Sequence, residues 1–273
     1  MKKLLSNLCM MTLFIVATSC NDDDVLLSRE LLLTRVERNG VTLLDFVFDT
    51  EKKLTRINTY SNGEPGAYYW FEYDDEGITE LLRYDANHSI DYKIVCTLDN
   101  FGRVIKGESY FPQSDFKVVN SLLSLSYDAS DQLAKRQFTT GSNPVFYADE
   151  FTYGVKNHLT KRIRTYYPNQ AGEFVGFQDD YTPGDKSIYG HWNNLVSALR
   201  VVGLDEYIWE ILNTRNHHTN WNEEGEITFD TQTEASEREY NADGYLIRQV
   251  TTRRDLLGKG NDASFEMTYE YTK

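Results

Sequence analysis

A short unit recurs along this chain of 273 residues and restricts what it can fold into. The unit begins with an aromatic residue or Leu, usually continues with Asp or Asn and a few polar residues, and ends with a branched aliphatic residue. Copies begin at Phe48, Tyr73, Leu98, Tyr127, Tyr153, Trp221 and Tyr240, and the first five lie 25, 25, 29 and 26 residues apart. Two strands of about eight to ten residues with their turns give that period, which is typical of repeated β-hairpins.

The residues inside the unit favour a tight turn. An Asp or Asn in the second position accepts a hydrogen bond from the backbone two residues on, and a Gly three positions later closes a type I turn with a bulge. That slot holds Gly77, Gly102, Gly225 and Gly244, and elsewhere Asp131 and Asn157, which tolerate positive φ. Lys52 fits this slot poorly. We predict structural turns at Gly77, Gly102 and Gly244.

Looser turns separate the tight ones, at residues 61–67, 85–89, 111–115, 139–144 and 168–173. We expect Gly63 and Gly66 in these to tolerate substitution better than Gly77, and Gly102 to tolerate Asn. The alternation predicts an all-β fold, an antiparallel meander of about 14–16 strands. So many strands do not form one flat sheet, so we expect a strongly curved or barrel-like sheet in a single domain over residues 30–273.

One segment, residues 193–212, departs from the strand pattern. Leu195, Leu199 and Val202 are spaced at helical intervals, Gly203 interrupts them, and Asp205 is placed to cap a second short helix. We predict a short helical insertion against the sheet.

Charges fall on both faces of the expected strands. In the last strand, Glu266 and Glu270 alternate with Met267 and Tyr269, and Lys161 is followed by Arg162 and Arg164. A charge in the middle of a lipid-facing strand costs about 2–4 kcal/mol. The sequence therefore favours a sheet with a solvated outer face over a membrane-spanning barrel.

The first 19 residues have the layout of a signal peptide. Lys2 and Lys3 precede an apolar run from Leu8 to Val16 that is too short to span a bilayer. Small residues then lead to Cys20, which resembles the lipobox cysteine of bacterial lipoproteins. That resemblance implies lipidation of Cys20 and a membrane anchor. The alternative is an ordinary secretory signal cleaved near residue 19.

Three aspartates, Asp22, Asp23 and Asp24, follow the cysteine. They resemble the acidic tags beside the lipidated cysteine of Bacteroidetes lipoproteins, which are associated with export to the cell surface. They also suit a solvated tether over residues 20–29, because like charges extend a chain. We therefore expect a lipid-anchored, surface-exposed protein of the outer membrane.

Charge and cysteine content exclude several classes of function. Without Lys2 and Lys3, 26 basic residues face 42 acidic ones, a net charge of −16, which argues against nucleic acid as a partner. Once Cys9 and Cys20 are accounted for, Cys96 is left alone, so we expect no disulfide and no cysteine metal site. Its alternation with neighbouring apolar residues favours a core thiol over a catalytic nucleophile.

Other candidate sites have weak patterns. His217 and His218 could bind one metal ion only from a loop, and a solvated loop is the simpler interpretation. Calcium binding by Asp179, Asp180 and Asp185, or glycoside hydrolysis by Glu223 and Glu224, lacks the spacing that these functions use. No Ser-hydrolase, zinc-protease or phosphate-loop motif occurs. We predict no catalytic residues, no metal and no cofactor.

The aromatic run Tyr68, Tyr69 and Trp70 is the best ligand candidate. Consecutive strand residues project from both faces, so one set packs in the core and the other can stack on a sugar or peptide. Packing alone also explains the run.

The lipobox, the repeated hairpins, the "YGHWNNL" segment and the ending "YNADGYLIRQVTTRRD…FEMTYEYTK" together resemble a Bacteroidetes lipoprotein family of unknown function with a porin-like domain. The resemblance covers residues 30–273 and implies a barrel-like sheet without an established activity. The hairpins also resemble the YD repeats of large bacterial toxin shells. We expect a surface-tethered, non-enzymatic binding or structural protein. A hydrolase or accessory protein acting on glycans remains the alternative and would need two carboxylates in an aromatic cleft.

Overall fold

The computed structural model describes residues 31–141, 145–154, 158–167, 173–184 and 213–272. These residues form sixteen β-strands and one short 3-10 helix, η2 (Pro112–Ser114). The strands are β1 (Leu32–Arg38), β2 (Val41–Phe48), β3 (Leu54–Ser61), β4 (Glu64–Tyr73), β5 (Ile78–Tyr84), β6 (Ile90–Leu98), β7 (Val104–Tyr110), β8 (Val119–Tyr127), β9 (Leu133–Thr140), β10 (Tyr147–Tyr153), β11 (Leu159–Tyr166), β12 (Phe174–Pro183), β13 (Asn213–Trp221), β14 (Ile227–Tyr240), β15 (Leu246–Asp255) and β16 (Ala263–Thr272).

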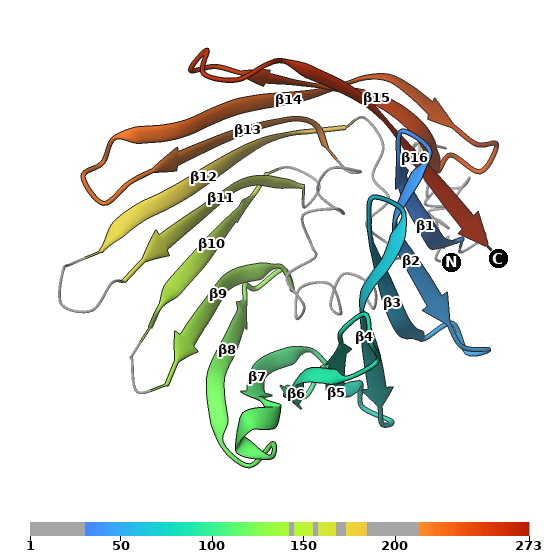
Figure 1. The fold of residues 1–273 in the computed structure, drawn as a ribbon, viewed down its shortest axis with the longest axis vertical. Coiled ribbons are helices and arrows are strands. Elements are labelled where there is room, and N and C mark those ends of the chain that lie inside the picture. Colours follow the sequence, from blue (N-terminus) through green and yellow to red (C-terminus); the bar gives the residue numbers. More distant parts are fainter. Residues whose placement is uncertain (1–30, 142–144, 155–157, 168–172, 185–212, 273) are drawn as a thin grey trace, which may run out of the picture.

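The strands close into a barrel (Figure 1). Each strand pairs antiparallel with its neighbours in the chain, and β1 pairs with β16, where Leu32 lies opposite Thr272. The prediction of an all-β antiparallel meander of 14–16 strands is therefore confirmed. The sheet curves until its first and last strands pair, so it is a closed barrel. The helical insertion predicted at 193–212 lies outside the described residues.

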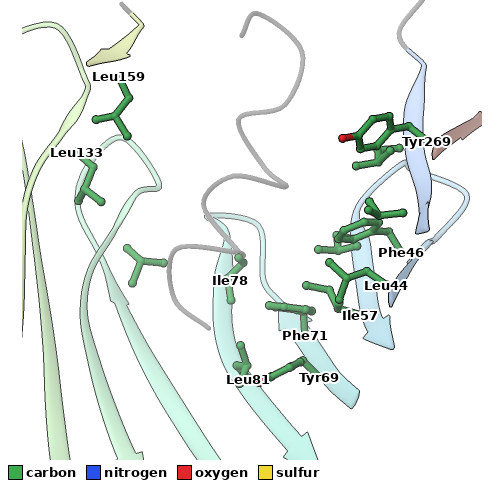
Figure 2. Packing of buried hydrophobic residues seen from close by; sticks show 14 of the residues in the cluster. Leu44, Phe46, Ile57, Tyr69, Phe71, Ile78, Leu81, Leu133, Leu159 and Tyr269 are labelled. Carbon is green, nitrogen blue, oxygen red and sulfur yellow. The ribbon is translucent and has the colours of Figure 1, made fainter. Parts of the chain in front are cut away.

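The inner face of the barrel holds the core. Paired residues share a face, so Phe46, Ile57 and Tyr69 form one inward row across β2, β3 and β4. All three are buried, with Ile57 at 0% exposure. Figure 2 shows such side chains projecting into the space that the barrel encloses, with Leu133 and Leu159 on the facing wall.

The inner face is chemically uneven. Within the described strands, the buried polar side chains lie on β9–β15, except for Ser109 on β7 and Ser121 on β8. The buried apolar side chains of β1–β5 and β16 form the opposite part of the wall. The barrel thus encloses an apolar side and a polar side.

The outer face carries ion pairs. Arg35 contacts Asp45 at 2.7 Å, Arg248 contacts Glu266 at 2.6 Å, and these residues alternate with inward-facing core residues. A transmembrane β-barrel has the reverse arrangement, an apolar band outside and polar residues inside. This outer face is therefore built to meet water, as the charge pattern of the sequence indicates.

No helix in the described ranges has the length and apolar character needed to cross a bilayer.

Most copies of the repeated unit form one kind of tight turn. In the unit at Leu98, the Asp99 carboxylate accepts hydrogen bonds from the amides of Phe101 and Arg103, at 2.9 and 3.0 Å. Gly102 between them has φ +73°. The same pattern of side-chain acceptance starts from Asp49, Asp85, Asp128 and Asn241. These bonds fix the backbone so that the fourth turn residue takes positive φ.

Two turns differ from the expectation. Lys52 was expected to fit poorly, yet it has φ +63° because Asp49 binds the amides on both sides of it. Residues 85–89 were expected to be a looser turn, yet His88 also has φ +63°. Segment 85–89 is therefore a further copy of the unit, with His in the glycine slot.

The glycine turns also differ among themselves. Gly244 has φ +86° as predicted, but Gly77 has φ +150° because its turn is one residue shorter and closes from the Asp74 amide to the Gly77 carbonyl. The segment after β3 is a two-residue turn in which Asn62 and Gly63 both have positive φ, 52° and 83°. Gly63 is therefore constrained as well, which corrects its assignment to a looser turn.

Tyrosines connect successive units. The hydroxyl of Tyr127 donates to the backbone carbonyl of Val104, at 2.9 Å, and Val104 is the last residue of the preceding unit. Equivalent bonds join Tyr73 to Leu54, Tyr153 to Leu133 and Tyr271 to Leu246. The hydroxyl needs a partner at this depth, since burial raises the pKa of Tyr73 and of Tyr271 well above the usual range. We call these bonds the tyrosine ladder.

Candidate functional site

Charged side chains meet inside the polar wall. Strand register places Arg136, Asp149 and Arg164 in one inward row across β9, β10 and β11. The Asp149 carboxylate accepts hydrogen bonds from Arg136 at 2.7 and 2.9 Å and from Arg164 at 2.6 and 2.9 Å. The next row places Arg162 beside Asp179, whose nearest atoms are 4.0 Å apart. These five residues form the arginine–aspartate network.

The network is deeply buried. The Asp149 side chain has 0% exposure and the Arg162 side chain 2%. Burial raises the pKa of Asp149, but the hydrogen bond from Arg164 and the charges of Arg136 and Arg162 outweigh burial, and the pKa lies below its usual range. Aromatic rings cover the cations, with the Arg164 guanidinium 3.9 Å from the Tyr147 ring centre. Three arginines against two aspartates leave one positive charge.

A pocket of about 330 Å³ lies beside the network, against β12–β15. We call it the β12–β15 pocket. Its volume is in the range of small-molecule sites, about 300–1,000 Å³. Strand register turns Asp179, Asn216 and Thr251 toward the barrel interior, so the pocket opens on the inner face. The lining includes Phe177, Asp179, Tyr181, Asn216, His218, Thr231, Thr233, Thr251 and Arg253.

His218 is oriented by Asp179. The Nδ1 atom of its ring lies 2.6 Å from the Asp179 carboxylate, and rings of Phe177 and Phe229 lie 5.4 and 5.8 Å away, centre to centre. In the neutral ring, an Nδ1–H that donates to Asp179 leaves Nε2 as an acceptor. The pair is thus suited to hold a ligand donor in a fixed direction.

Among the described lining residues, some buried polar atoms have no hydrogen-bond partner. They are the buried Thr251 Oγ1 and Asn216 Oδ1 atoms. Thr251 is only 4% exposed. Buried polar groups are nearly always paired, and an unpaired one costs about 1–3 kcal/mol. Two such groups on one pocket wall indicate a site that a polar ligand completes.

The histidine pair does not form a metal site. His217 and His218 lie on β13, not in the solvated loop that the sequence favoured, and they face opposite sides of the sheet. His217 contacts Asp230 on the outer face at 2.7 Å, while His218 faces the pocket. No group of three or more His, Cys, Asp or Glu side chains in the described ranges is arranged to hold a metal ion.

The acidic candidates are also separated. Asp179 and Asp180 are neighbours on β12 and point to opposite faces, so they do not build a calcium loop, and Asp185 lies outside the described residues. Glu223 and Glu224 are exposed in the turn between β13 and β14 and do not line the pocket.

The aromatic run is divided between the two faces of β4. Tyr69 packs in the core, while Tyr68 stacks on Tyr84 with ring centres 4.6 Å apart on the outer face. Trp70 is 41% exposed. Tyr68 and Trp70 therefore share the outer face while Tyr69 packs inside, as strand alternation requires, and stacking of the outer pair on a ligand stays a prediction.

Cys96 packs against the core cluster, as the alternation indicated. Burial, with a smaller contribution from the charge of Glu80, raises the pKa of its thiol to about 12. A protonated thiol is a poor nucleophile. Cys20, Asp22, Asp23 and Asp24 lie outside the described residues.

The sequence did not point to this pocket. The signal that the sequence offered was the charge of Arg162 and Arg164, which interrupts the apolar pattern expected of an inward-facing strand. Their partners come from strands far along the chain, and the threonines of β14 and β15 have no distinctive pattern.

Comparisons with known proteins match the fold. No family model and no curated protein matches the chain. Among solved structures, a porin-like protein from Bacteroides uniformis ATCC 8492 is similar, with a TM-score of 0.56 and 13% identity over 88% of this chain and 98% of that chain. This likeness confirms the porin-like, barrel-shaped fold that the resemblance implied, and at such identity it shows the fold alone.

Two other solved structures have lower scores. A porin-like protein from Bacteroides vulgatus ATCC 8482 has a TM-score of 0.35 and 9% identity, over 88% of this chain and 98% of that chain. The structure of TcdB2-TccC3-TEV has a TM-score of 0.37 and 11% identity, over 85% of this chain and 12% of that chain.

Proposed function

We propose that this protein is a lipid-anchored, surface-exposed binding protein of the outer membrane whose barrel interior holds a small saccharide. The observation that carries the proposal is the β12–β15 pocket, with unpaired Thr251 and Asn216 atoms in its wall. Hydroxyls and amides recognise sugar hydroxyls, and the rings of Phe177 and Tyr181 suit the apolar face of a sugar.

The pocket favours binding over glycoside hydrolysis. Hydrolysis uses two carboxylates about 5–10 Å apart. Among the described lining residues, Asp179 is the single carboxylate. Its Oδ1 atom already lies 2.6 Å from Nδ1 of His218. A glycan-active hydrolase would therefore need a second acid from another part of the chain.

The pocket can be tested by a substitution that separates binding from stability. Thr251→Val removes the unpaired hydroxyl without changing the shape of the side chain, so the thermal melt should stay the same or rise slightly. Affinity for a bound sugar should fall about 5–10-fold, since about 1 kcal/mol of hydrogen bonding is lost. The measurement is calorimetric titration of the full chain in detergent with a panel of mono- and disaccharides.

Thr252→Val is the matched control, since Thr252 is the next residue on β15 and faces outward. It should leave sugar affinity unchanged. Failure of every sugar in the panel to bind the wild-type chain would overturn the saccharide proposal, and loss of affinity in Thr252→Val alone would place the site elsewhere.

The anchor is tested at Cys20. Acyl chains stabilise membrane binding by about 0.8 kcal/mol per buried CH₂, so the wild-type chain should stay in the membrane fraction until detergent is added. Cys20→Ala should appear in the soluble fraction with an unchanged melt, because residue 20 precedes β1. Membrane retention of Cys20→Ala would contradict the lipoprotein assignment.

Export is tested by replacing Asp22, Asp23 and Asp24 with Asn. These changes should keep the protein in the membrane fraction but protect it from protease added to intact cells, if the acidic residues direct it to the surface. Unchanged cleavage would leave them as a tether only.

A further inference from the structure

We propose that the β12–β15 pocket selects an acidic saccharide, and that Arg253 pairs with the carboxylate or sulfate group of the sugar. This inference rests on the proposed function, since it specifies the class of sugar that the pocket takes. Charged side chains in the pocket that already have partners are not available to a ligand, and those without partners are.

Arg253 faces the barrel interior. It lies on β15 opposite Thr233 of β14, and Thr233 and Thr251 line the pocket beside it. Its neighbour Arg254 lies opposite Gln232 and faces outward. Among the residues that the structure describes, no carboxylate pairs with Arg253, and its side chain is exposed to the space inside the barrel.

Most described arginines of this acidic chain, which has 42 Asp and Glu against 28 Lys and Arg, contact a carboxylate or an aromatic ring, whereas Arg253 inside the barrel and Arg254 outside it do not. Arg35, Arg83, Arg103, Arg136, Arg164 and Arg248 each contact a carboxylate. Arg38 and Arg56 lie over aromatic rings instead. Arg215 lies in the outward row of β13, opposite Thr182 and Glu234, so its side chain does not compete for a ligand inside the barrel. Among the described residues, Arg253 is therefore an inward-facing cation that borders the cavity without a carboxylate partner.

The carboxylates nearby are committed. Asp179 is held by His218 at 2.6 Å and lies 4.0 Å from Arg162. Asp255, the next inward residue along β15 from Arg253, accepts from the amides of Leu257 and Gly260. Neither of these two described carboxylates forms an ion pair with Arg253. The arginine–aspartate network behind Asp179 adds a further positive charge, which a buried site screens little.

Within the described part of the pocket, Arg253 therefore lacks an anion, and the uncharged lining residues determine which other ligand groups can bind. A guanidinium binds carboxylate or sulfate through two parallel hydrogen bonds. Thr231, Thr233, Thr251 and Asn216 can hold hydroxyl groups around that anchor. A uronic acid or a sulfated sugar carries both features on one ring.

The experiment compares three sugars that differ at one carbon. The full chain in detergent is titrated calorimetrically with galactose, galacturonic acid and galactose 6-sulfate, and with the corresponding glucose set. The acidic member of a set should bind at least 10-fold more tightly than the neutral member, and the preference should weaken as salt is raised. Comparison of the two acidic members tells carboxylate from sulfate.

Arg253→Gln should abolish that preference and leave the weaker affinity for the neutral sugar. Arg254→Gln, one residue along and on the outer face, should keep the preference, and both variants should melt like the wild type because both side chains are exposed.

The outcomes separate the two proposals. Equal affinity for neutral and acidic sugars, or a preference that survives Arg253→Gln, would overturn this inference while the saccharide pocket stands. Binding of no sugar would overturn both. Cleavage of a disaccharide from the earlier panel, or release of sulfate from galactose 6-sulfate, would overturn the non-enzymatic role.

Discussion

Replacing Asp149 with Asn is expected to lower the free energy of unfolding by about 3–5 kcal/mol, the usual cost of removing one partner from a buried ion pair. Asp149 accepts from Arg136 and Arg164 and lies 3.5 Å from Arg162, and its side chain has no exposure. The amide cannot balance three guanidinium groups, which then remain charged in the barrel interior. Denaturant unfolding measures the loss.

The pH dependence gives this prediction a sign. The pKa of Asp149 is depressed in the folded chain, so its contribution is full above the unfolded pKa of about 3.9 and is lost as pH falls through the folded pKa. The gap between wild type and Asp149→Asn should therefore be constant near neutral pH and close at pH values below about 4.

A carboxylate on the outer face provides the control. Asp45 accepts from Arg35 at 2.7 Å and from Tyr60 at 2.6 Å, at a half-buried position. Asp45→Asn should cost about 1 kcal/mol, since water solvates the arginine that is left. An equal loss in both variants would mean that the inner network is as well hydrated as the outer face.

Gly102 is expected to be the least replaceable of the turn glycines whose surroundings are described. A Cβ atom at Gly102 would lie 2.6 Å from the Glu76 carbonyl oxygen, which belongs to the neighbouring turn. Gly225 has nearly the same conformation, φ +80° against +73°, and nothing lies within 4 Å of its Cβ position. The two glycines therefore separate backbone strain from steric contact.

Valine at both positions and asparagine at both positions make the test. Val should cost about 1–3 kcal/mol at Gly225 from strain, and a further 1–3 kcal/mol or so at Gly102 from the contact. Asn should be mild at Gly225 and cost about 1–3 kcal/mol at Gly102, contrary to the tolerance that the sequence suggested. Thermal melts of the four variants that give equal losses at the two sites would contradict the contact.

The repeated turns were predictable because their chemistry is local. Asp99 accepts hydrogen bonds from amides two and four residues further along, so the residues that form the turn are close together in the sequence. The misassigned positions show the limit of residue preferences. Lys52 and His88 take positive φ because the carboxylates of Asp49 and Asp85 bind the backbone around them, and this outweighs the intrinsic cost at the fourth position.

The pocket was not predictable, because strand register decides it. Irregularities such as the one between Arg164 and Thr165 shift which residues face inward, and each shift reverses the alternation beyond it. His217 and His218 are adjacent in the sequence but face opposite sides of the sheet. Asp179 and His218 lie 39 positions apart in the sequence and are in contact. Periodicity within one strand carries no record of such pairs.

Because of the tyrosine ladder, the number of hairpins determines the circumference of this barrel. Each rung joins a tyrosine only to the end of the unit before it, as Tyr127 joins Val104, and the last rung joins Tyr271 to Leu246 next to the seam between β16 and β1. A whole hairpin could be duplicated or deleted between two rungs with every remaining rung intact. Barrels of this design should therefore grow and shrink in steps of two strands, with wider or narrower interiors and unchanged turns.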